Sequence, residues 1–254
     1  MKQLAAIYSA EMLKLKRSIA LQLVLLVPLL IILLMIGTLL NKNPENYNQK
    51  MFFSMLQSVY VSWLVLVLPM FLAIVTGLIS ANEQMTSQWK HIFCLPVKRG
   101  KVLLAKWLVE ISVLIAANLV LSILFILAFP ILNACMPQIN FILFLNGVDF
   151  LNIFSLVCLM SLGVASLQFA FSLLLPGLIP AIGLGIAAVT FSMGVSYSGL
   201  AVDLFPWTLP MVAVSNYVSL DLDVSIPRAI YASLIFSLGS CGMAVPWFTR
   251  KDVF

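Results

Sequence analysis

Long runs of uncharged residues constrain this chain more than any other feature of its sequence. Residues 150–202 contain no Lys, Arg, Asp or Glu over 53 positions, and shorter runs of this kind cover 18–41, 51–82, 111–148 and 229–249. Only 9% of the chain is charged and 63% is hydrophobic, whereas an ordinary soluble domain is about 25% charged. Because helices satisfy their own backbone groups in lipid, we predict an all-α polytopic membrane protein.

The lengths of these runs predict the transmembrane helices. A helix of about 20 apolar residues crosses the hydrocarbon core, so the 53-residue run must turn, and Pro176-Gly177 with Pro180 marks the break. The segment 204–220 contains two prolines, and we expect it to be an extracellular re-entrant or interfacial segment. We therefore predict a single membrane domain over 1–254, with six spans at about 18–40, 52–80, 104–129, 150–174, 178–199 and 228–248.

The basic residues predict the orientation of these spans. With six spans, the side that holds both termini carries Lys2, Lys14, Lys16, Arg17, Lys90, Lys98, Arg99, Lys101, Lys106, Arg250 and Lys251. The other side carries only Lys42, Lys50 and Arg228. Loops rich in Lys and Arg stay in the cytoplasm, so both termini are expected there. Since the basic residues lie near span ends, we expect the lipid bilayer as a partner and no nucleic acid.

The segment 2–17 precedes the first span and is predicted to be a helix. Its apolar residues recur at helical spacing, at Leu4, Tyr8, Met12 and Leu15. Its basic residues suit anionic headgroups, so we expect an interfacial helix that lies on the inner leaflet with its apolar face toward lipid. The alternative is a basic flank that only sets topology.

The segment 82–101 is the one sizeable loop expected in the cytoplasm. Asn82 is a plausible N-cap, which places Glu83 favourably at a helix start. The apolar residues that follow share one helical face, at Met85, Trp89, Ile92 and Phe93. Pro96 ends this helix, and a basic turn containing Arg99 and Gly100 leads to the third span. Such a short helix needs a covering partner, and either a protein or the membrane interface would serve.

The order of these parts resembles the permease subunit of type-2 ABC (ABC-2 type) exporters. The parts are the basic N-terminal helix, Glu83 after the second span, the Pro-Val-Lys-Arg turn at 96–99, Lys106 before the third span, and Phe-Thr-Arg-Lys-Asp at 248–252. Within that family the chain looks most like the short bacterial permeases that export lantibiotics, bacitracin or other membrane-active peptides for self-protection. The resemblance covers the whole chain and implies a location in the bacterial cytoplasmic membrane.

The resemblance also implies partners and the residues that meet them. The loop after span two would be the coupling helix that docks on a separate ATPase, through Glu83, Met85, Trp89, Ile92, Phe93, Pro96 and Arg99. The N-terminal connecting helix would border the same ATPase through Glu11, Lys14 and Arg17. The assembly would contain two ABC ATPase subunits and a second permease, identical or paralogous. The segment 204–220 would correspond to the short extracellular helices of the family.

The sequence itself predicts neither a cofactor nor a catalytic or metal site in this chain. It contains no G-x-x-x-x-G-K-[ST] motif, so ATP and Mg²⁺ are expected on the partner ATPase. With one histidine and no Cys-x-x-Cys, a zinc site is not expected. Peptide-bond chemistry would need a nucleophile with a base, a carboxylate pair or a metal. We therefore expect a transport subunit and not an enzyme.

The cargo is predicted less directly. Asp203, Asp221 and Asp223 surround the segment 204–220 on the outer side, with Trp207 nearby. An acidic rim would attract a cationic peptide, although outer acidic residues also follow from topology alone. The alternatives are ABC export of another apolar cargo, such as a drug, a lipid or a self-produced toxic peptide, and a small ion-coupled carrier. For a carrier the relevant residue is Glu110, which otherwise forms an i,i+4 salt bridge with Lys106.

Small residues in span five suggest where helices approach each other closely. They include Gly183, Gly185 and Gly194. Small faces allow close packing of helices in lipid. The face lies either inside one subunit or against the partner permease.

The orientation leads to a labelling prediction. Cys94 should react only with membrane-permeant thiol reagents in intact cells, because the basic bias places its loop in the cytoplasm. A cysteine introduced at Asn46 should react with impermeant reagents. Labelling of Cys94 by an impermeant reagent would contradict the six-span topology.

Overall fold

The structure is a computed structural model of the whole chain. It describes residues 2–16, 18–40, 49–85, 97–135, 149–175, 177–198, 202, 204–215 and 226–250. Within these ranges every regular element is a helix, which confirms the all-α prediction for the part of the chain described. The elements are α1 (Lys2–Lys16), α2 (Ile19–Leu40), α3 (Gln49–Val61), a π-helix (Ser62–Val67), α4 (Leu68–Met85), α6 (Arg99–Cys135), α8 (Phe150–Leu174), α9 (Leu178–Ser198), α10 (Leu209–Ser215) and α11 (Ile226–Arg250).

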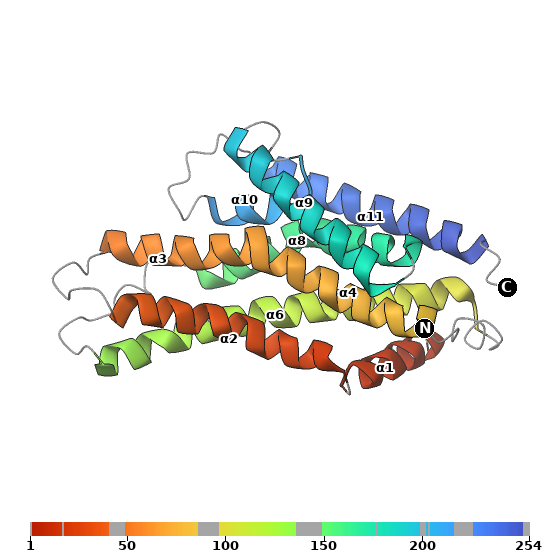
Figure 1. Cartoon of the computed structure of the whole chain (residues 1–254), viewed down its shortest axis with the longest axis horizontal. Coiled ribbons are helices and arrows are strands. Elements are labelled where there is room, and N and C mark those ends of the chain that lie inside the picture. Colours follow the sequence, from red (N-terminus) through yellow and green to blue (C-terminus); the bar gives the residue numbers. More distant parts are fainter. Residues whose placement is uncertain are drawn as a thin grey trace.

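The long helices run along the long axis of the molecule (Figure 1). The start of α1, the end of α4, the start of α6 and the end of α11 lie at one end of the bundle, on the right in this view. The end of α2 and the start of α3 lie at the opposite end. Placing the first and last helical residues at the same end fits an even number of membrane crossings.

Five helices of the described part are long and apolar enough to cross a membrane. They are Ile19–Leu40, Phe52–Ile79, Arg99–Cys135, Phe150–Leu174 and Ile179–Ser196. The predicted sixth span corresponds to α11, a 25-residue helix that packs extensively against α8. The chain is therefore a multi-pass membrane protein, and the sixth crossing stays a prediction.

The predicted helix boundaries around the loop 82–101 are wrong in two places. α4 continues through Asn82 and Glu83 to Met85, so Asn82 does not cap a new helix and Glu83 lies in the last turn of span two. α6 begins at Arg99, so Gly100 lies in its first turn and not in a basic turn before it. The first backbone N–H groups of a helix lack intrahelical partners in any case, and glycine is therefore tolerated there.

α6 also continues past the predicted end of span three. It is 37 residues long and passes through Pro130 to Cys135. Proline removes one backbone hydrogen bond, but in membrane bundles neighbouring helices and local adjustments compensate for it. α6 packs against α1, α2, α8 and α11. It therefore connects the N-terminal helices to the C-terminal ones.

The second span is one helical path with a π-helical segment in its middle. The π-helix Ser62–Val67 joins α3 to α4 and buries Trp63 completely. Trp63 Nε1 donates a hydrogen bond of 2.8 Å to Oδ1 of the buried Asn118 on α6. A polar side chain in the bundle core is thus paired across helices, as an apolar environment requires.

The contact between α8 and α11 depends on small and hydroxyl-bearing residues. Ser233 Oγ of α11 donates to the Leu159 carbonyl at 2.8 Å, and the Gly163 N–H donates to Ser233 Oγ at 3.0 Å. A Cβ atom at Gly163 would meet the Ser233 backbone at 3.2 Å. Close approach of helices through small residues is the usual way in which helices pack in lipid.

The turn from α8 to α9 contains a glycine with a positive φ. Gly177 has a φ of 105° there, which glycine adopts without strain.

The contact between α8 and α11 predicts the effect of enlarging Gly163. Gly163→Val should destabilise the protein by about 1–3 kcal/mol, the usual cost of overpacking, because its branched side chain meets the Ser233 backbone. A Cβ atom at Gly239 of α11 would have no neighbour within 4 Å in the part of the chain described, so Gly239→Val is the matched control and should change stability little. Thermal unfolding in detergent measures both variants, and equal effects would contradict this packing.

Candidate functional site

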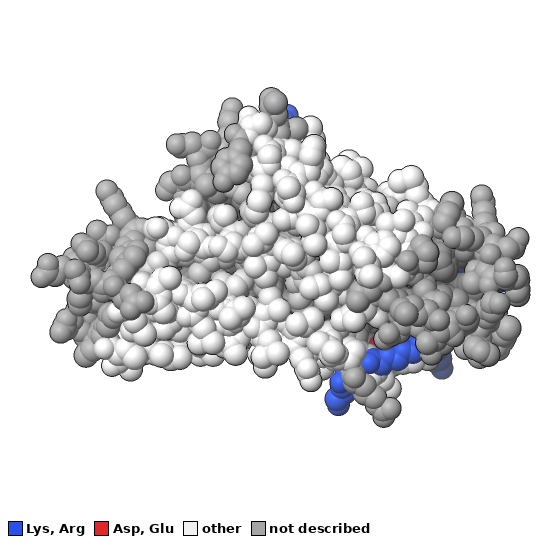
Figure 2. Space-filling view, in the orientation of Figure 1, with Lys and Arg blue, Asp and Glu red and all other residues white. Residues whose placement is uncertain are grey.

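Two of the predicted docking residues, Glu11 and Lys14, lie where the N-terminal helix packs on the third span. We call this region the α1–α6 junction, formed by Tyr8, Glu11 and Lys14 of α1 with Lys106 and Ser112 of α6. Figure 2 shows Lys and Arg side chains gathered where α1 lies, whereas the middle of this face shows no charged side chain. The junction therefore lies at the charged end of the bundle, close to the start of α6 (Figure 1).

Glu11 is the central residue of the α1–α6 junction. Its side chain is held between two ammonium groups: Oε2 accepts from Lys106 Nζ at 2.7 Å, and Oε1 accepts from Lys14 Nζ at 2.7 Å. Glu11 is 7% exposed and Lys106 is 1% exposed, whereas the Lys14 side chain is 53% exposed. The pair Glu11–Lys106 is therefore buried, and removing one partner of a buried pair costs about 3–5 kcal/mol.

The electrostatics of Glu11 follow from this arrangement. Burial by itself raises the pKa of the Glu11 carboxyl, since it disfavours the charged form. The charge and hydrogen bond of Lys106, with a further contribution from Lys14, act in the opposite direction and outweigh it. The net result is a Glu11 pKa below its ordinary value. Glu11 is therefore an ionised carboxylate at neutral pH and attracts both lysines.

Two further polar contacts connect α1 to α6. The hydroxyl groups of Tyr8 and Ser112 share a hydrogen bond of 2.7 Å. Lys101 Nζ donates to Gln3 Oε1 at 2.8 Å. Together with the Glu11–Lys106 pair, these contacts distribute the attachment along α1. A helix held at several points along its length moves with the helix that holds it.

The apolar residues of α1 pack on the bundle, which corrects one expectation. Leu15 is buried in the hydrophobic core, and Tyr8 and Met12 pack against that core. The predicted helix forms, but its apolar face is covered mainly by α6 and not left open to lipid. The carboxylate of Glu11 lies on the same side of α1 and binds Lys106 of α6.

The expected salt bridge between Lys106 and Glu110 is wrong. Lys106 pairs with Glu11 because α1 brings a carboxylate within 2.7 Å of its ammonium. Glu110 is 0% exposed, and neither of its carboxylate oxygens has a hydrogen-bond partner among the described residues. An i,i+4 spacing made the pairing possible, but it could not reveal that a distant segment competes for the same lysine.

The other predicted docking residues fall largely outside the described part of the chain. Glu83 lies in the last turn of α4 and Met85 is its final residue, with side chains outside the description. Arg99 is the first residue of α6. The residues outside the described ranges are Arg17, Trp89, Ile92, Phe93 and Pro96. Glu11 and Lys14 are thus the predicted docking residues that the structure brings together.

Of the residues predicted at the outer rim, the structure describes Trp207. It is buried beside α8, where its ring stacks on Phe171 with centroids 6.2 Å apart and also contacts Phe205 at 5.6 Å. The short helix α10 follows directly and packs against α8 and α3. Trp207 therefore fills the bundle here, and its role in cargo contact stays a prediction. Asp203, Asp221 and Asp223 lie outside the described residues.

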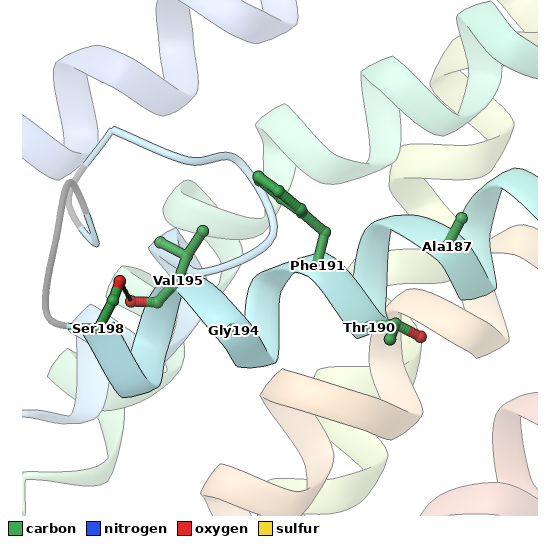
Figure 3. Close-up of a pocket in the computed structure, with 6 residues that line it drawn as sticks. All are labelled: Ala187, Thr190, Phe191, Gly194, Val195 and Ser198. Carbon is green, nitrogen blue, oxygen red and sulfur yellow. Dashed lines mark hydrogen bonds between the residues drawn. The ribbon is translucent and has the colours of Figure 1, made fainter.

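The outward face of α9 carries an open, mainly apolar groove. Its lining residues all belong to α9: Ala187, Thr190, Phe191, Gly194, Val195 and Ser198 (Figure 3). Phe191 is exposed at one side of it, and the Ser198 hydroxyl donates back to the Val195 carbonyl at 2.9 Å. In the part of the chain described, no three His, Cys, Asp or Glu side chains come together as a metal ion would need.

Comparison with known families gives one match over most of the chain. A family model described as ABC-2 family transporter protein matches residues 7–192, which is more than half of the chain. The chain belongs to this family. The matched region of this ABC-2 protein begins within α1 and ends within α9, so it includes the α1–α6 junction. The family places it as the membrane subunit of an ABC transporter. No curated protein and no solved structure matched.

Sequence reasoning on this ABC-2 subunit missed Lys106 as the partner of Glu11 and Ser112 as the partner of Tyr8. A weak signal was present, since Tyr8 and Glu11 lie three residues apart and therefore on one side of α1. An acidic residue on the otherwise apolar side of a basic helix indicates a buried cation nearby. The sequence could not show which of the basic residues supplies it.

The lowered pKa of Glu11 predicts a pH dependence. A carboxyl whose pKa is lower in the folded than in the unfolded protein stabilises the fold. This contribution is complete at pH values above the unfolded-state pKa, about 4.3, and it is lost as the pH falls through the folded-state pKa. The deficit in melting temperature of Glu11→Gln relative to wild type should thus be full at pH 7 and shrink under acid. Tyr8→Phe removes the bond to Ser112 without a charge, so its deficit should stay constant. A Glu11→Gln deficit that is independent of pH would contradict the ion pair.

Proposed function

We propose that this ABC-2 subunit is the permease of an ATP-driven exporter in the bacterial cytoplasmic membrane, with both termini in the cytoplasm. Its cargo is an amphipathic antimicrobial peptide of the lantibiotic type, expelled for self-protection or resistance. ATP hydrolysis takes place on two separate ABC ATPase subunits, which also carry ATP and Mg²⁺. The membership of the family supports the permease role, and the resemblance to peptide-immunity permeases supports the cargo.

The α1–α6 junction is the observation that carries the mechanism. The predicted ATPase-docking segment follows α4 and precedes α6 in the chain. The end of α4 and the start of α6 lie at the same end of the bundle as the start of α1 (Figure 1). α1 is attached to α6 by the buried Glu11–Lys106 pair and by the Tyr8–Ser112 bond. A displacement applied at this end would therefore move α1 and α6 together. α6 is 37 residues long and transmits the displacement through the whole bundle.

The proposed cycle follows from this connection. ATP binding brings the two ATPase subunits together and displaces the docking segments. α6 transmits the movement to α8 and α11, against which it packs. The permease pair then switches its cavity or pushes bound cargo outward. The acidic residues predicted on the outer side, Asp203, Asp221 and Asp223, would attract a cationic peptide there.

A second permease, identical or paralogous, is proposed to pack along α9. Only 22% of the 18-residue span Ile179–Ser196 is buried inside the chain, compared with 56% of an apolar 18-residue stretch within Phe52–Ile79. Among the described residues, a Cβ atom at Gly183 or Gly194 would have nothing within 4 Å. Small residues with open space before them allow another helix to approach closely. α9 is therefore the face that a partner permease would cover.

The docking proposal predicts the effect of removing one aromatic side chain. Trp89 is the largest residue on the apolar face predicted for the loop after span two. Trp89→Ala should weaken ATPase binding by about 2 kcal/mol, the scale of an interface hot spot, or roughly 30-fold in affinity. Co-purification of the ATPase measures this effect, and peptide resistance should fall with it. Ser87→Ala, two positions earlier and on the opposite side of such a helix, is the matched control and should bind normally.

The outcomes separate the parts of the proposal. Unchanged ATPase binding and unchanged resistance in Trp89→Ala would mean that the docking segment is assigned wrongly. If the wild-type protein binds the ATPase normally but gives cells no resistance to a lantibiotic, the permease role would be retained and this cargo would be excluded. Drug, lipid or toxin export would then be the cargo to test.

A further inference from the structure

Apolar and basic side chains are exposed together where α1 meets α2. α1 ends at Lys16 and α2 begins at Ile19. The N–H and the hydroxyl of Ser18 both donate to the Leu15 carbonyl, at 2.9 and 2.8 Å, which holds the start of α2 against the end of α1. Leu13 and Ile19 are each 64% exposed. Lys16 is also exposed and lies three residues after Leu13, on the same side of α1. We call Leu13, Lys16 and Ile19 the α1–α2 corner.

The apolar part of the α1–α2 corner continues into the outer surface of α2. This helix contains no charged residue, and it exposes a row of leucines: Leu21, Leu25, Leu26, Leu30, Leu33, Leu34 and Leu40. A surface of this kind faces the hydrocarbon of the bilayer. In Figure 2 the middle of the face is free of charged side chains, and basic ones begin where α1 lies. The corner therefore lies at the level where hydrocarbon gives way to lipid headgroups.

The charge at this level is positive. Glu11 is the acidic residue of α1, and both of its carboxylate oxygens are already bound, to Lys106 and Lys14. None of the described acidic side chains pairs with Lys16. A lysine near the end of a span keeps its methylene groups in apolar surroundings and extends its ammonium to the headgroups. Lys16, beside two exposed apolar side chains, is in the position for such a contact.

We propose that the α1–α2 corner binds an anionic phospholipid of the leaflet at this end of the bundle, which is the inner leaflet in the predicted topology. Leu13 and Ile19 contact the upper part of the acyl chains, and the Lys16 ammonium pairs with the anionic headgroup. A zwitterionic headgroup is a weaker partner, because it carries a cation of its own. A water-soluble protein would match the lysine but would not continue the lipid-facing surface of α2.

The lipid contact complements the attachment of α1 to the bundle. One side of α1 packs on α6 through Tyr8 and Glu11, and Leu13 lies on the side turned away from them. The sequence pattern predicted lipid on the side that α6 covers, whereas the corner places lipid on the other. This binding site goes beyond the proposed export function, because it requires neither a particular cargo nor the ATPase.

Stabilisation by added lipid tests the site. The melting temperature of the purified full-length protein in detergent would be measured against increasing concentrations of dioleoylphosphatidylglycerol, dioleoylphosphatidylcholine or inorganic phosphate. The anionic lipid should raise the melting temperature, and the other two should not at the same concentrations. Lys16→Gln should raise the half-saturating concentration of the anionic lipid roughly fivefold, the contribution of one lysine at an anionic membrane surface. Leu13→Asn should raise it too.

Lys98→Gln is the matched control. It removes another exposed lysine from the same end of the bundle, but Lys98 directly precedes α6, near where Lys101 binds Gln3 at the other end of α1. The half-saturating concentration should stay at the wild-type value.

Several outcomes would overturn the lipid site. Equal effects of Lys16→Gln and Lys98→Gln would show a general attraction between the basic end and anionic lipid. Equal stabilisation by inorganic phosphate would show binding of a free anion, and equal stabilisation by phosphatidylcholine would show that charge is not recognised. If Lys16→Gln keeps the lipid dependence but loses co-purification with the ATPase, the corner belongs to the ATPase interface instead.

Discussion

The buried ion pair between Glu11 and Lys106 is the interaction on which the arrangement of the helices depends. A lysine inside a membrane bundle is costly unless a partner neutralises it, and Lys106 is 1% exposed. The partner comes from α1, a helix that precedes the first span. The pair therefore determines where α1 lies, and α1 in turn covers the start of α6 with Tyr8, Met12 and Leu15.

Buried polar groups on α6 also need partners, and these partners connect α6 to the rest of the bundle. Polar side chains along it find partners on other helices: Asn118 accepts from Trp63 of the π-helix, and Trp107 donates to Ser166 of α8. Ser166 in turn shares a hydrogen bond with Ser237 of α11. Each of these hydrogen bonds takes the place of a bond to water, which the apolar environment does not supply. α6 is consequently connected to α1, the second span, α8 and α11, which suits a helix that transmits movement.

The sequence predicted the helices better than their contacts. The apolar run from 150 and the Pro-Gly break located α8 and α9 closely, because length and hydropathy alone decide what crosses a membrane. The prediction was wrong at Gly100 and Pro130, which lie inside α6. Glycine is tolerated in the first turn of a helix, where the N–H groups lack intrahelical partners in any case, and neighbouring helices compensate for the hydrogen bond that proline removes. The π-helix at Trp63 left no recognisable pattern in the sequence.

Hydrogen-bond and ion-pair partners on different helices could not be predicted, because the i,i+4 spacing relates only residues of the same helix. Lys106 and Glu110 have the right separation for a salt bridge, yet the structure gives the lysine to a residue 95 positions away. Trp207 looked suited to the outer surface, yet it packs on Phe171 of α8. The predicted ATPase-docking face, centred on Trp89, lies outside the described residues and stays a prediction.

A double-mutant cycle on Glu11 and Lys106 tests the central claim most directly. The free energy of unfolding would be measured in detergent for wild type, Glu11→Gln, Lys106→Met and the double variant. If the two side chains form a buried pair, the double variant should be more stable than the sum of the single effects predicts, with a coupling energy of about 1 kcal/mol or more. Strictly additive effects would show that α1 and α6 are not held together by this pair.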